Sequence, residues 1–62
     1  MTEATGTEPV RVLVVDDQEL FRRGLITLLA GDADIEVVGE AADGVTATDL
    51  AVKTAPDVIL LD

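Results

Sequence analysis

Short apolar runs alternate with longer amphipathic segments through most of this chain. The run Val10–Val15 (VRVLVV) is β-branched and nearly all apolar, which predicts a strand buried on both faces. Residues 18–30 follow a helical period, and the short apolar run at 35–39 (IEVVG) predicts a second strand. Residues 45–54 predict a second helix, and the apolar run at 58–61 predicts a third buried strand. The order is therefore strand, helix, strand, helix, strand.

This alternation predicts an α/β fold with a parallel sheet. Connections between parallel strands are right-handed in nearly every case. If the third strand lies beside the first, on the side away from the second, the two helices must cover opposite faces of the sheet. We therefore predict a β-α-β-α-β part of a doubly wound parallel sheet, with the strand order 2-1-3.

The predicted helix at 18–30 has one apolar face. Arg22 and Arg23 fall opposite this face, so we expect both on the solvated side of the helix. Phe21 lies within the apolar face and is expected in the core. Gly31 follows the helix, at a position that favours a residue free to adopt a positive φ angle. The apolar face comprises Leu20, Phe21, Gly24, Leu25, Leu28 and Leu29.

The segments around the second helix carry turn and boundary signals. Asp43 and Gly44 predict a turn, with Asp43 as the N-cap of the helix that follows. Pro56 ends that helix, because proline cannot continue it. Residues 1–9 (MTEATGTEP) are polar and contain glycine and proline, so we expect a disordered leader there.

Composition excludes several classes of function. The 62 residues include 13 acidic and 4 basic side chains, and the net charge of −9 disfavours binding to nucleic acid or an anionic membrane. The chain has no cysteine, which removes disulfides and thiolate metal sites, and one phenylalanine is its sole aromatic residue. No apolar run approaches the roughly 20 residues of a membrane span, and residues 1–9 show no secretory signal, so the expected location is the cytoplasm.

Acidic side chains follow two strands that the predicted sheet makes neighbours. Asp16 and Asp17 come directly after the first strand, and Asp62 comes directly after the third. In a sheet of order 2-1-3, the carboxyl ends of these strands flank the topological switch point, where ligands bind. Clustered carboxylates repel one another and favour a cation, and oxygen donors without histidine or cysteine favour Mg²⁺. One carboxylate could then attack a phosphoryl group and carry it as an acyl phosphate.

These acids also have a simpler interpretation. Asp17 could cap the helix that begins near Gln18, and Asp62 could be an ordinary residue at a strand end. The acidic pair alone favours this interpretation, because short motifs match by chance. The presence of Asp62 on the other side of the switch point favours a site instead.

Three segments, VRVLVVDDQELFRRGLITLL, VVGEAADG and PDVILLD, occur in this order and spacing. Together they resemble the first half of the receiver domain of two-component response regulators, and the resemblance extends from about Val10 to Asp62. The segment RRGLITLLAGDADIEVVGEAADG is most similar to the subfamily whose receivers precede a LuxR-type helix-turn-helix output domain. The resemblance implies a flavodoxin-like receiver fold.

The resemblance also implies roles for the three acids. Asp62 matches the phosphoacceptor, which takes a phosphoryl group from a phosphohistidine on a sensor histidine kinase. Asp17 matches the acid that ligates Mg²⁺ directly, and Asp16 matches the acid that acts mainly through metal-bound water, so that Asp16, Asp17 and Asp62 form the metal site. Such a module is no enzyme beyond promoting its own phosphorylation and dephosphorylation. The implied parent contacts DNA through a C-terminal output domain, not through this segment or a membrane, and can form a homodimer on phosphorylation.

The chain departs from the receiver pattern after Asp62. A receiver continues with a metal-binding carbonyl, a Thr or Ser, a Lys, an aromatic switch residue and strands four and five. We therefore expect a truncated receiver domain over residues 10–62, with an open apolar edge on its third strand. Two alternatives remain. The first is half of a Mg²⁺-dependent phosphohydrolase similar to the haloacid dehalogenases, which is disfavoured because Gln18 stands in place of the second Asp of their DxD pattern. The second is an inactive fragment.

Overall fold

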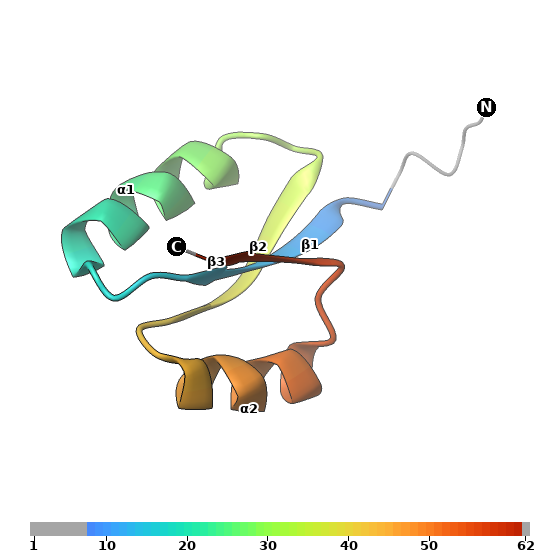
Figure 1. The fold of residues 1–62 in the computed structure, drawn as a ribbon. Helices are drawn as coiled ribbons and strands as arrows, with labels where there is room; N and C mark the ends of the chain where they lie inside the picture. Colours follow the sequence, from blue (N-terminus) through green and yellow to red (C-terminus); the bar gives the residue numbers. More distant parts are fainter. Residues whose placement is uncertain (1–7, 62) are drawn as a thin grey trace.

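The computed structural model describes residues 8–61 and shows five elements in the predicted order (Figure 1). Residues 1–7 of the predicted leader and the predicted phosphoacceptor Asp62 lie outside this range. Neither helix of the described range is long and apolar enough to cross a lipid bilayer. The elements are β1 (Val10–Val15), α1 (Glu19–Ala30), β2 (Ile35–Ala41), α2 (Gly44–Thr54) and β3 (Val58–Leu61).

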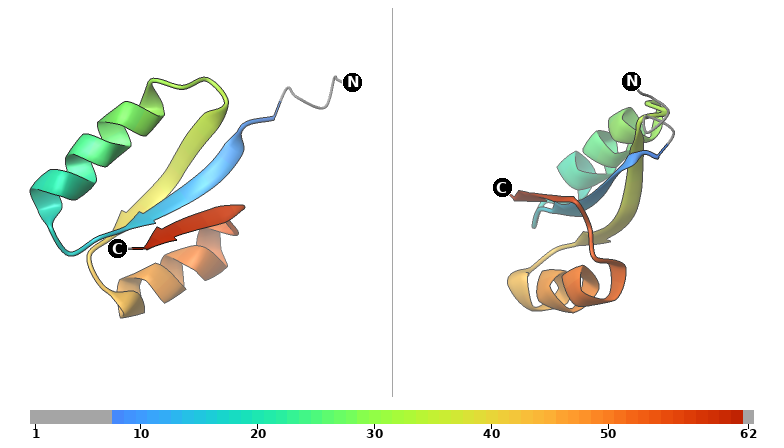
Figure 2. Two further views of the ribbon diagram at one scale, coloured as in Figure 1. Left: turned by 45° about the horizontal axis from the view of Figure 1, so that its top comes forward. Right: turned by 90° about the vertical axis from the view of Figure 1, so that its right-hand side faces the viewer.

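The strands form one parallel sheet with the order β2-β1-β3. The central strand β1 pairs with β2 on one side and with β3 on the other. Helix α1 covers one face of the sheet and α2 covers the opposite face (Figures 1 and 2). The predicted fold class, strand order and placement of the helices are therefore confirmed.

Burial differs sharply between the central strand and the edge strand. Residues 12–15 of β1 are buried, and Leu13 and Val14 are almost completely shielded from solvent. A central strand between two helical layers meets no water, which explains its nearly continuous apolar sequence. By contrast, all four residues of β3 are exposed, so the prediction that this strand is buried is wrong. Within residues 8–61, β3 pairs with β1 alone, so its other, apolar edge is open there, as expected.

A close approach between α2 and the sheet depends on Gly39 of β2. The pairing of β1 with β2 shifts by one residue between Val12 and Leu13. A β-carbon on Gly39 would lie 3.3 Å from Cδ1 of Leu13 and 3.6 Å from Cδ1 of Leu50. The missing side chain therefore lets Leu50 of α2 pack directly over β1 and β2.

The two ends of α2 differ in how far they were predicted: its N-cap was predicted, and its left-handed C-terminal residue was not. The prediction of Asp43 as N-cap is confirmed, since its Oδ1 accepts a 2.8 Å hydrogen bond from the backbone N–H of Thr46. Gly31 has a φ of −76°, so the expected positive φ is wrong. The end of α1 stays right-handed, and the backbone N–H of Gly31 donates to the carbonyl of Leu28. Ala55, at the end of α2, adopts the left-handed conformation instead, with a φ of 48°. Pro56 disfavours the right-handed helical conformation at Ala55.

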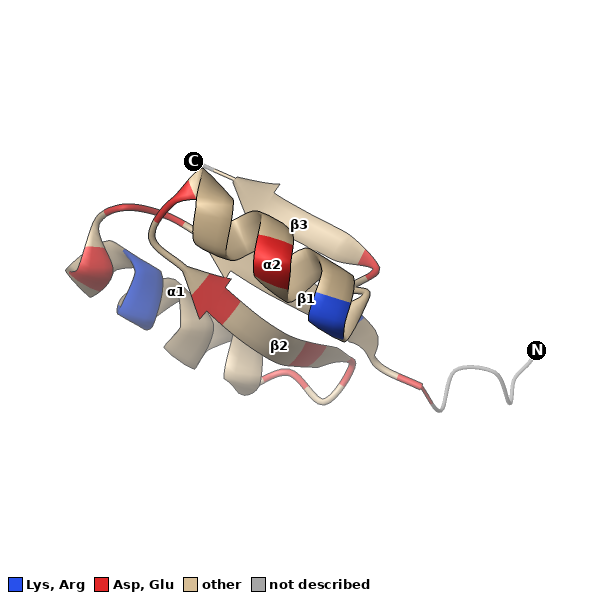
Figure 3. Cartoon of the chain, turned by 90° about the horizontal axis from the view of Figure 1, so that it is seen from below, with Lys and Arg blue, Asp and Glu red and all other residues tan. Residues whose placement is uncertain are grey.

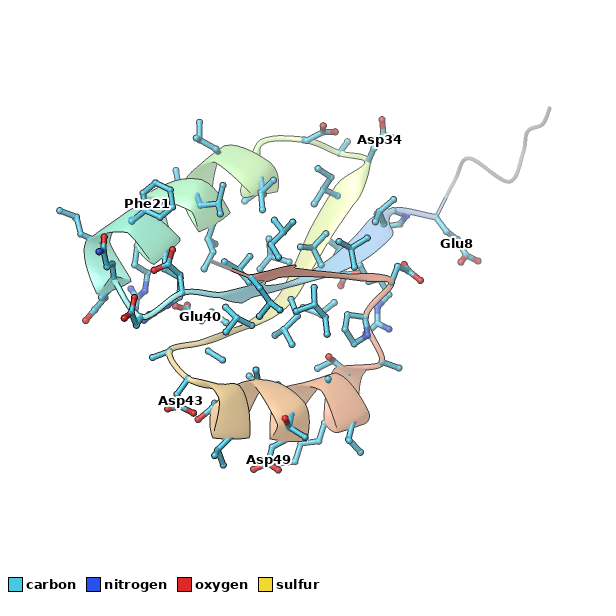
Figure 4. All side chains as sticks on the ribbon, in the orientation of Figure 1. Glu8, Phe21, Asp34, Glu40, Asp43 and Asp49 are labelled. Atoms are coloured by element: carbon cyan, nitrogen blue, oxygen red, sulfur yellow. The ribbon has the colours of Figure 1, made fainter. Side chains whose placement is uncertain are left out.

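The side of α1 that faces the sheet differs from the predicted apolar face. Arg22 is buried, with 9% of its surface exposed, so the prediction of a solvated Arg22 is wrong. The solvated position of Arg23 is confirmed, whereas Phe21 is 57% exposed instead of lying in the core (Figure 4). The guanidinium of Arg22 can be buried because it finds hydrogen-bond acceptors at the end of the sheet. Of the predicted apolar face, Leu20, Phe21, Gly24 and Leu28 are exposed, and Leu25 and Leu29 are half-buried.

Candidate functional site

The three strands end at one edge of the sheet. Val15, the last residue of β1, pairs with Ala41 of β2 and with Leu61 of β3. All three strands point towards this edge, which lies on the left in Figure 1. Asp16 directly follows Val15, and Asp62 directly follows Leu61 in the sequence. The register therefore agrees with the predicted meeting of these acids at the carboxyl edge, although the position of Asp62 itself stays a prediction.

Asp16 is the buried acid of the edge, with 3% of its surface exposed. Its backbone N–H donates to the carbonyl of Ala41 at 3.0 Å. Its side-chain Oδ1 accepts a 2.8 Å hydrogen bond from the backbone N–H of Gln18. Within residues 8–61, no hydrogen bond reaches the second carboxylate oxygen, Oδ2. A buried carboxylate oxygen without a donor is suited to a cation or to cation-bound water.

Asp17 differs from Asp16 in its surroundings. It is exposed, and the N-cap of α1 is Gln18, which makes no side-chain capping bond. The simpler interpretation of Asp17 as a helix cap is therefore wrong. Its side chain makes no hydrogen bond or ion pair within the described part of the chain, so its carboxylate is accessible at the edge.

A hollow of about 220 Å³ lies beside Asp16. Its walls come from Phe21 and Leu25 of α1 and from Leu60 and Leu61 of β3. Among residues 8–61, Asp16 is the one acidic residue in this lining, and the other described members are apolar. The hollow therefore gives access to the edge from the α1 side of the sheet.

Sequence reasoning missed two further members of the edge, Arg22 and Glu40. Nη1 of Arg22 donates to the backbone carbonyl of Asp16 at 2.7 Å, and its Nε donates to Oε1 of Glu40 at 2.7 Å. Arg23 also reaches Oε1 of Glu40, with its Nε at 3.2 Å. Glu40 lies near the end of β2, close to the start of α1 (Figure 4). The sequence did carry a signal for Glu40. It directly follows the strand predicted at 35–39, just as Asp16 directly follows the first predicted strand, so it could have been expected at the same edge.

The two arginines set the ionisation of Glu40. The hydrogen bond from Arg22 is the largest cause that lowers the pKa of Glu40 below its ordinary value, and the charge of Arg23 acts in the same direction. Desolvation opposes both but is outweighed. In Figure 3, the acidic loop that leads out of β1 lies next to the basic first half of α1. The lowered pKa favours the ionised form of Glu40, which compensates the buried charge of Arg22.

The donor set of the edge fits magnesium. Residues 8–61 contain no group of three or more histidine, cysteine or acidic side chains that could hold a metal ion, and the third predicted ligand, Asp62, lies outside this range. The two described members, Asp16 and Asp17, offer only carboxylate oxygens, the donors that Mg²⁺ prefers. The buried Oδ2 of Asp16 supports the same choice. The complete set of Asp16, Asp17 and Asp62 remains a prediction.

Comparison with known proteins identifies the family. Residues 12–62 match the model of the response regulator receiver domain. The transcriptional regulatory protein LiaR of Bacillus subtilis (strain 168) is 53% identical over 53 residues, which cover 86% of this chain and 25% of LiaR. Protein-glutamate methylesterase/protein-glutamine glutaminase 5 of Anaeromyxobacter dehalogenans (strain 2CP-C) is 52% identical over 58 residues, which cover 94% of this chain and 16% of that protein.

A solved structure agrees with this result. The signal receiver domain of the putative response regulator NarL from Mycobacterium tuberculosis superposes with a TM-score of 0.84 at 49% sequence identity. The match covers 89% of this chain and 44% of that one. The chain thus spans a quarter or less of the two relatives in length, and under half of the solved domain. Sequence and fold together show that this chain belongs to the response regulator receiver domain family.

Proposed function

We propose that this chain is the N-terminal half of a receiver that accepts a phosphoryl group on Asp62 from the phosphohistidine of a sensor histidine kinase. The observation that carries the proposal is the pairing of Val15 with Leu61 in neighbouring parallel strands. Asp16 and Asp62 each come directly after one member of this pair. Membership of the receiver family supports the same conclusion.

In the proposed site, Asp16, Asp17 and Asp62 would hold Mg²⁺. When bound, the cation supplies positive charge that offsets the carboxylates and the oxygens of the phosphoryl group. A carboxylate oxygen of Asp62 forms a bond to phosphorus while the bond from phosphorus to the histidine nitrogen breaks, which leaves an acyl phosphate on Asp62. Burial and the hydrogen bond from Gln18 keep the carboxylate of Asp16 in one orientation during this transfer.

The intact protein is proposed to control transcription through a DNA-binding output domain. The similarity to LiaR, named as a transcriptional regulatory protein, supports this choice. The similarity to a methylesterase would instead support an enzymatic output domain. We favour the DNA-binding output, because the sequence segment that begins at Arg22 and Arg23 is most similar to receivers that precede a LuxR-type output domain. In this proposal the receiver segment catalyses only its own phosphorylation and dephosphorylation. The parent works in the cytoplasm and forms a homodimer when phosphorylated.

Acetyl phosphate labelling tests the phosphoacceptor. The protein as its gene encodes it, incubated with Mg²⁺ and acetyl phosphate, is expected to gain one phosphoryl group per chain, which hydroxylamine removes. Asp62→Asn should abolish the adduct, whereas the control Asp49→Asn, an exposed acid on α2, should keep it. Persistence of the adduct in Asp62→Asn would contradict the assignment.

The family assignment leaves the phosphohydrolase alternative without support. An inactive fragment is favoured by one observation, the exposure of all four apolar residues of β3. Proton NMR of the isolated 62-residue chain separates this alternative from the proposal. Signals that broaden as the protein concentration rises, and that do not shift when Mg²⁺ is added, would favour a fragment that self-associates through β3. A sharp spectrum that responds to Mg²⁺ would favour the proposed receiver.

A further inference from the structure

Arg22 places a buried cation between the ends of β1 and β2. A guanidinium removed from water must recover its hydrogen bonds from the protein. Arg22 does so with two acceptors, the carbonyl of Asp16 directly after β1 and the carboxylate of Glu40 on β2, each at 2.7 Å. The side chain therefore joins α1 to two strand ends at once.

The bond from Arg22 to Asp16 reaches the backbone and not the carboxylate. That carbonyl belongs to the peptide group between Asp16 and Asp17, the two acids of the proposed metal site. The preceding peptide group is held as well, because the N–H of Asp16 donates to Ala41 at 3.0 Å. Asp16 is thus fixed on both sides, and the directions of both carboxylates depend on the peptide that Arg22 holds.

Arg23 provides a natural comparison. It shares the carboxylate oxygen of Glu40 with Arg22, at 3.2 Å, but its side chain is 62% exposed. In the described range it makes no hydrogen bond or ion pair with Asp16. A role that depends on the charge near Glu40 would involve both arginines, whereas a role in holding the acidic loop would involve Arg22 alone.

We propose that Arg22 is a positioning residue that holds the Asp16–Asp17 peptide in the conformation needed for Mg²⁺ binding. This inference rests on the proposed function, since it assigns the held loop to the metal site. Glu40 orients the guanidinium by accepting from its Nε. Lysine cannot take over this role, because an ammonium group lacks the planar fork that reaches two fixed acceptors.

The experiment compares Arg22→Met and Arg22→Lys with the control Arg23→Met in the protein as its gene encodes it. The first readout is the Mg²⁺ dissociation constant from calorimetry. The second is the ¹⁵N order parameter of the amides of Asp17 and Gln18, with the core amide of Val14 as an internal reference. A substitution that only weakened the whole fold would affect Val14 as well.

We expect both Arg22 variants to bind Mg²⁺ about tenfold more weakly than the wild type, the usual effect of losing a group that orients a metal ligand. The order parameters of Asp17 and Gln18 should fall from about 0.85 to below about 0.6, while Val14 stays unchanged. Arg23→Met should stay within about twofold of the wild type in Mg²⁺ affinity, because within residues 8–61 Arg23 makes no hydrogen bond to the Asp16–Asp17 peptide and so does not orient a proposed metal ligand.

Each other outcome also decides the question. Wild-type affinity and wild-type order parameters in Arg22→Met, or in Arg22→Lys should the first variant not fold, would overturn the positioning role. Equal losses in the Arg22 and Arg23 variants would replace it with a general effect of charge. If the wild type bound no Mg²⁺, the proposed function would fail, and unchanged order in the Arg22 variants would show separately that Arg22 does not hold the loop.

Discussion

Nε of Arg22 lies 2.7 Å from Oε1 of Glu40, although 18 positions separate the two residues. The pair joins α1 to the end of β2, and the side chain of Arg22 is only 10% exposed. Ion pairs on the open surface contribute little, but a buried arginine that loses its carboxylate is left without compensation. The pair is therefore expected to contribute to stability in a way that depends on pH.

The first prediction concerns that dependence. The pKa of Glu40 is lowered from its ordinary value of 4.5, mainly by the hydrogen bond from Arg22. A lowered pKa in the folded state means that the stabilisation is complete above the unfolded pKa and is lost as the pH falls through the folded one. Glu40→Gln should therefore lower the melting temperature most at neutral pH, and progressively less as the pH falls below 4.5 towards the lowered folded-state pKa.

Thermal unfolding monitored by circular dichroism between pH 3 and pH 7 checks this prediction. Glu36→Gln is the matched control, because it removes one negative charge from an exposed position of the same strand. A gap between the wild type and Glu40→Gln that stays constant over this pH range would contradict the assigned cause.

The second prediction contrasts two glycines. Gly39→Ala should destabilise the protein by about 1 kcal/mol, because the new β-carbon would lie 3.3 Å from the fully buried Leu13 and overpack the core. Gly24→Ala should stabilise it by roughly 0.5–1 kcal/mol, since Gly24 lies within α1 with nothing within 4 Å of the added carbon. Urea denaturation measures both changes. A Gly39→Ala variant as stable as the wild type would show that Leu13 and Leu50 can move aside.

The third prediction concerns the left-handed residue at the end of α2. Ala55 has φ and ψ of 48° and 61°, a conformation that costs a residue with a β-carbon about 1 kcal/mol. Ala55→Gly should relieve this cost and stabilise the protein by about 0.5 kcal/mol, after the extra entropy of glycine in the unfolded chain. Ala51→Gly, inside the same helix, should destabilise by about 1 kcal/mol. If both variants were destabilised equally in urea, the conformation of Ala55 would carry no strain.

Element order and topology could be predicted because each depends on local patterns. The apolar run of β1 and the helical periods around it indicate a parallel sheet, and, with the third strand beside the first, the right-handed crossover rule places the two helices on opposite faces. The position of Asp16 and Asp17 follows directly from this topology. Asp43 was found in the same way, since a cap is a local feature that a short segment reveals.

The burial of Arg22 could not be predicted from a helical wheel. A wheel assigns arginine to the solvated face, because it does not include an acceptor on another element. Glu40 provides that acceptor from β2, and the neighbouring Phe21, which the wheel assigned to the core, is exposed. The positive φ of Ala55 was not predicted either. Glycine is the residue most suited to a positive φ, so the prediction fell on Gly31, but the end of α1 stays right-handed there.

Calorimetric titration with Mg²⁺ tests the proposed carboxylate site most directly. The protein as its gene encodes it should bind one Mg²⁺ per chain, and so should the control Asp49→Asn. Asp17→Asn and Asp62→Asn, which remove proposed ligands, should each weaken binding at least about tenfold, because the cation loses a charged oxygen donor. A wild-type protein that takes up no Mg²⁺, or an Asp17→Asn variant that binds it as tightly as the wild type, would contradict a magnesium site at the carboxyl ends of β1 and β3.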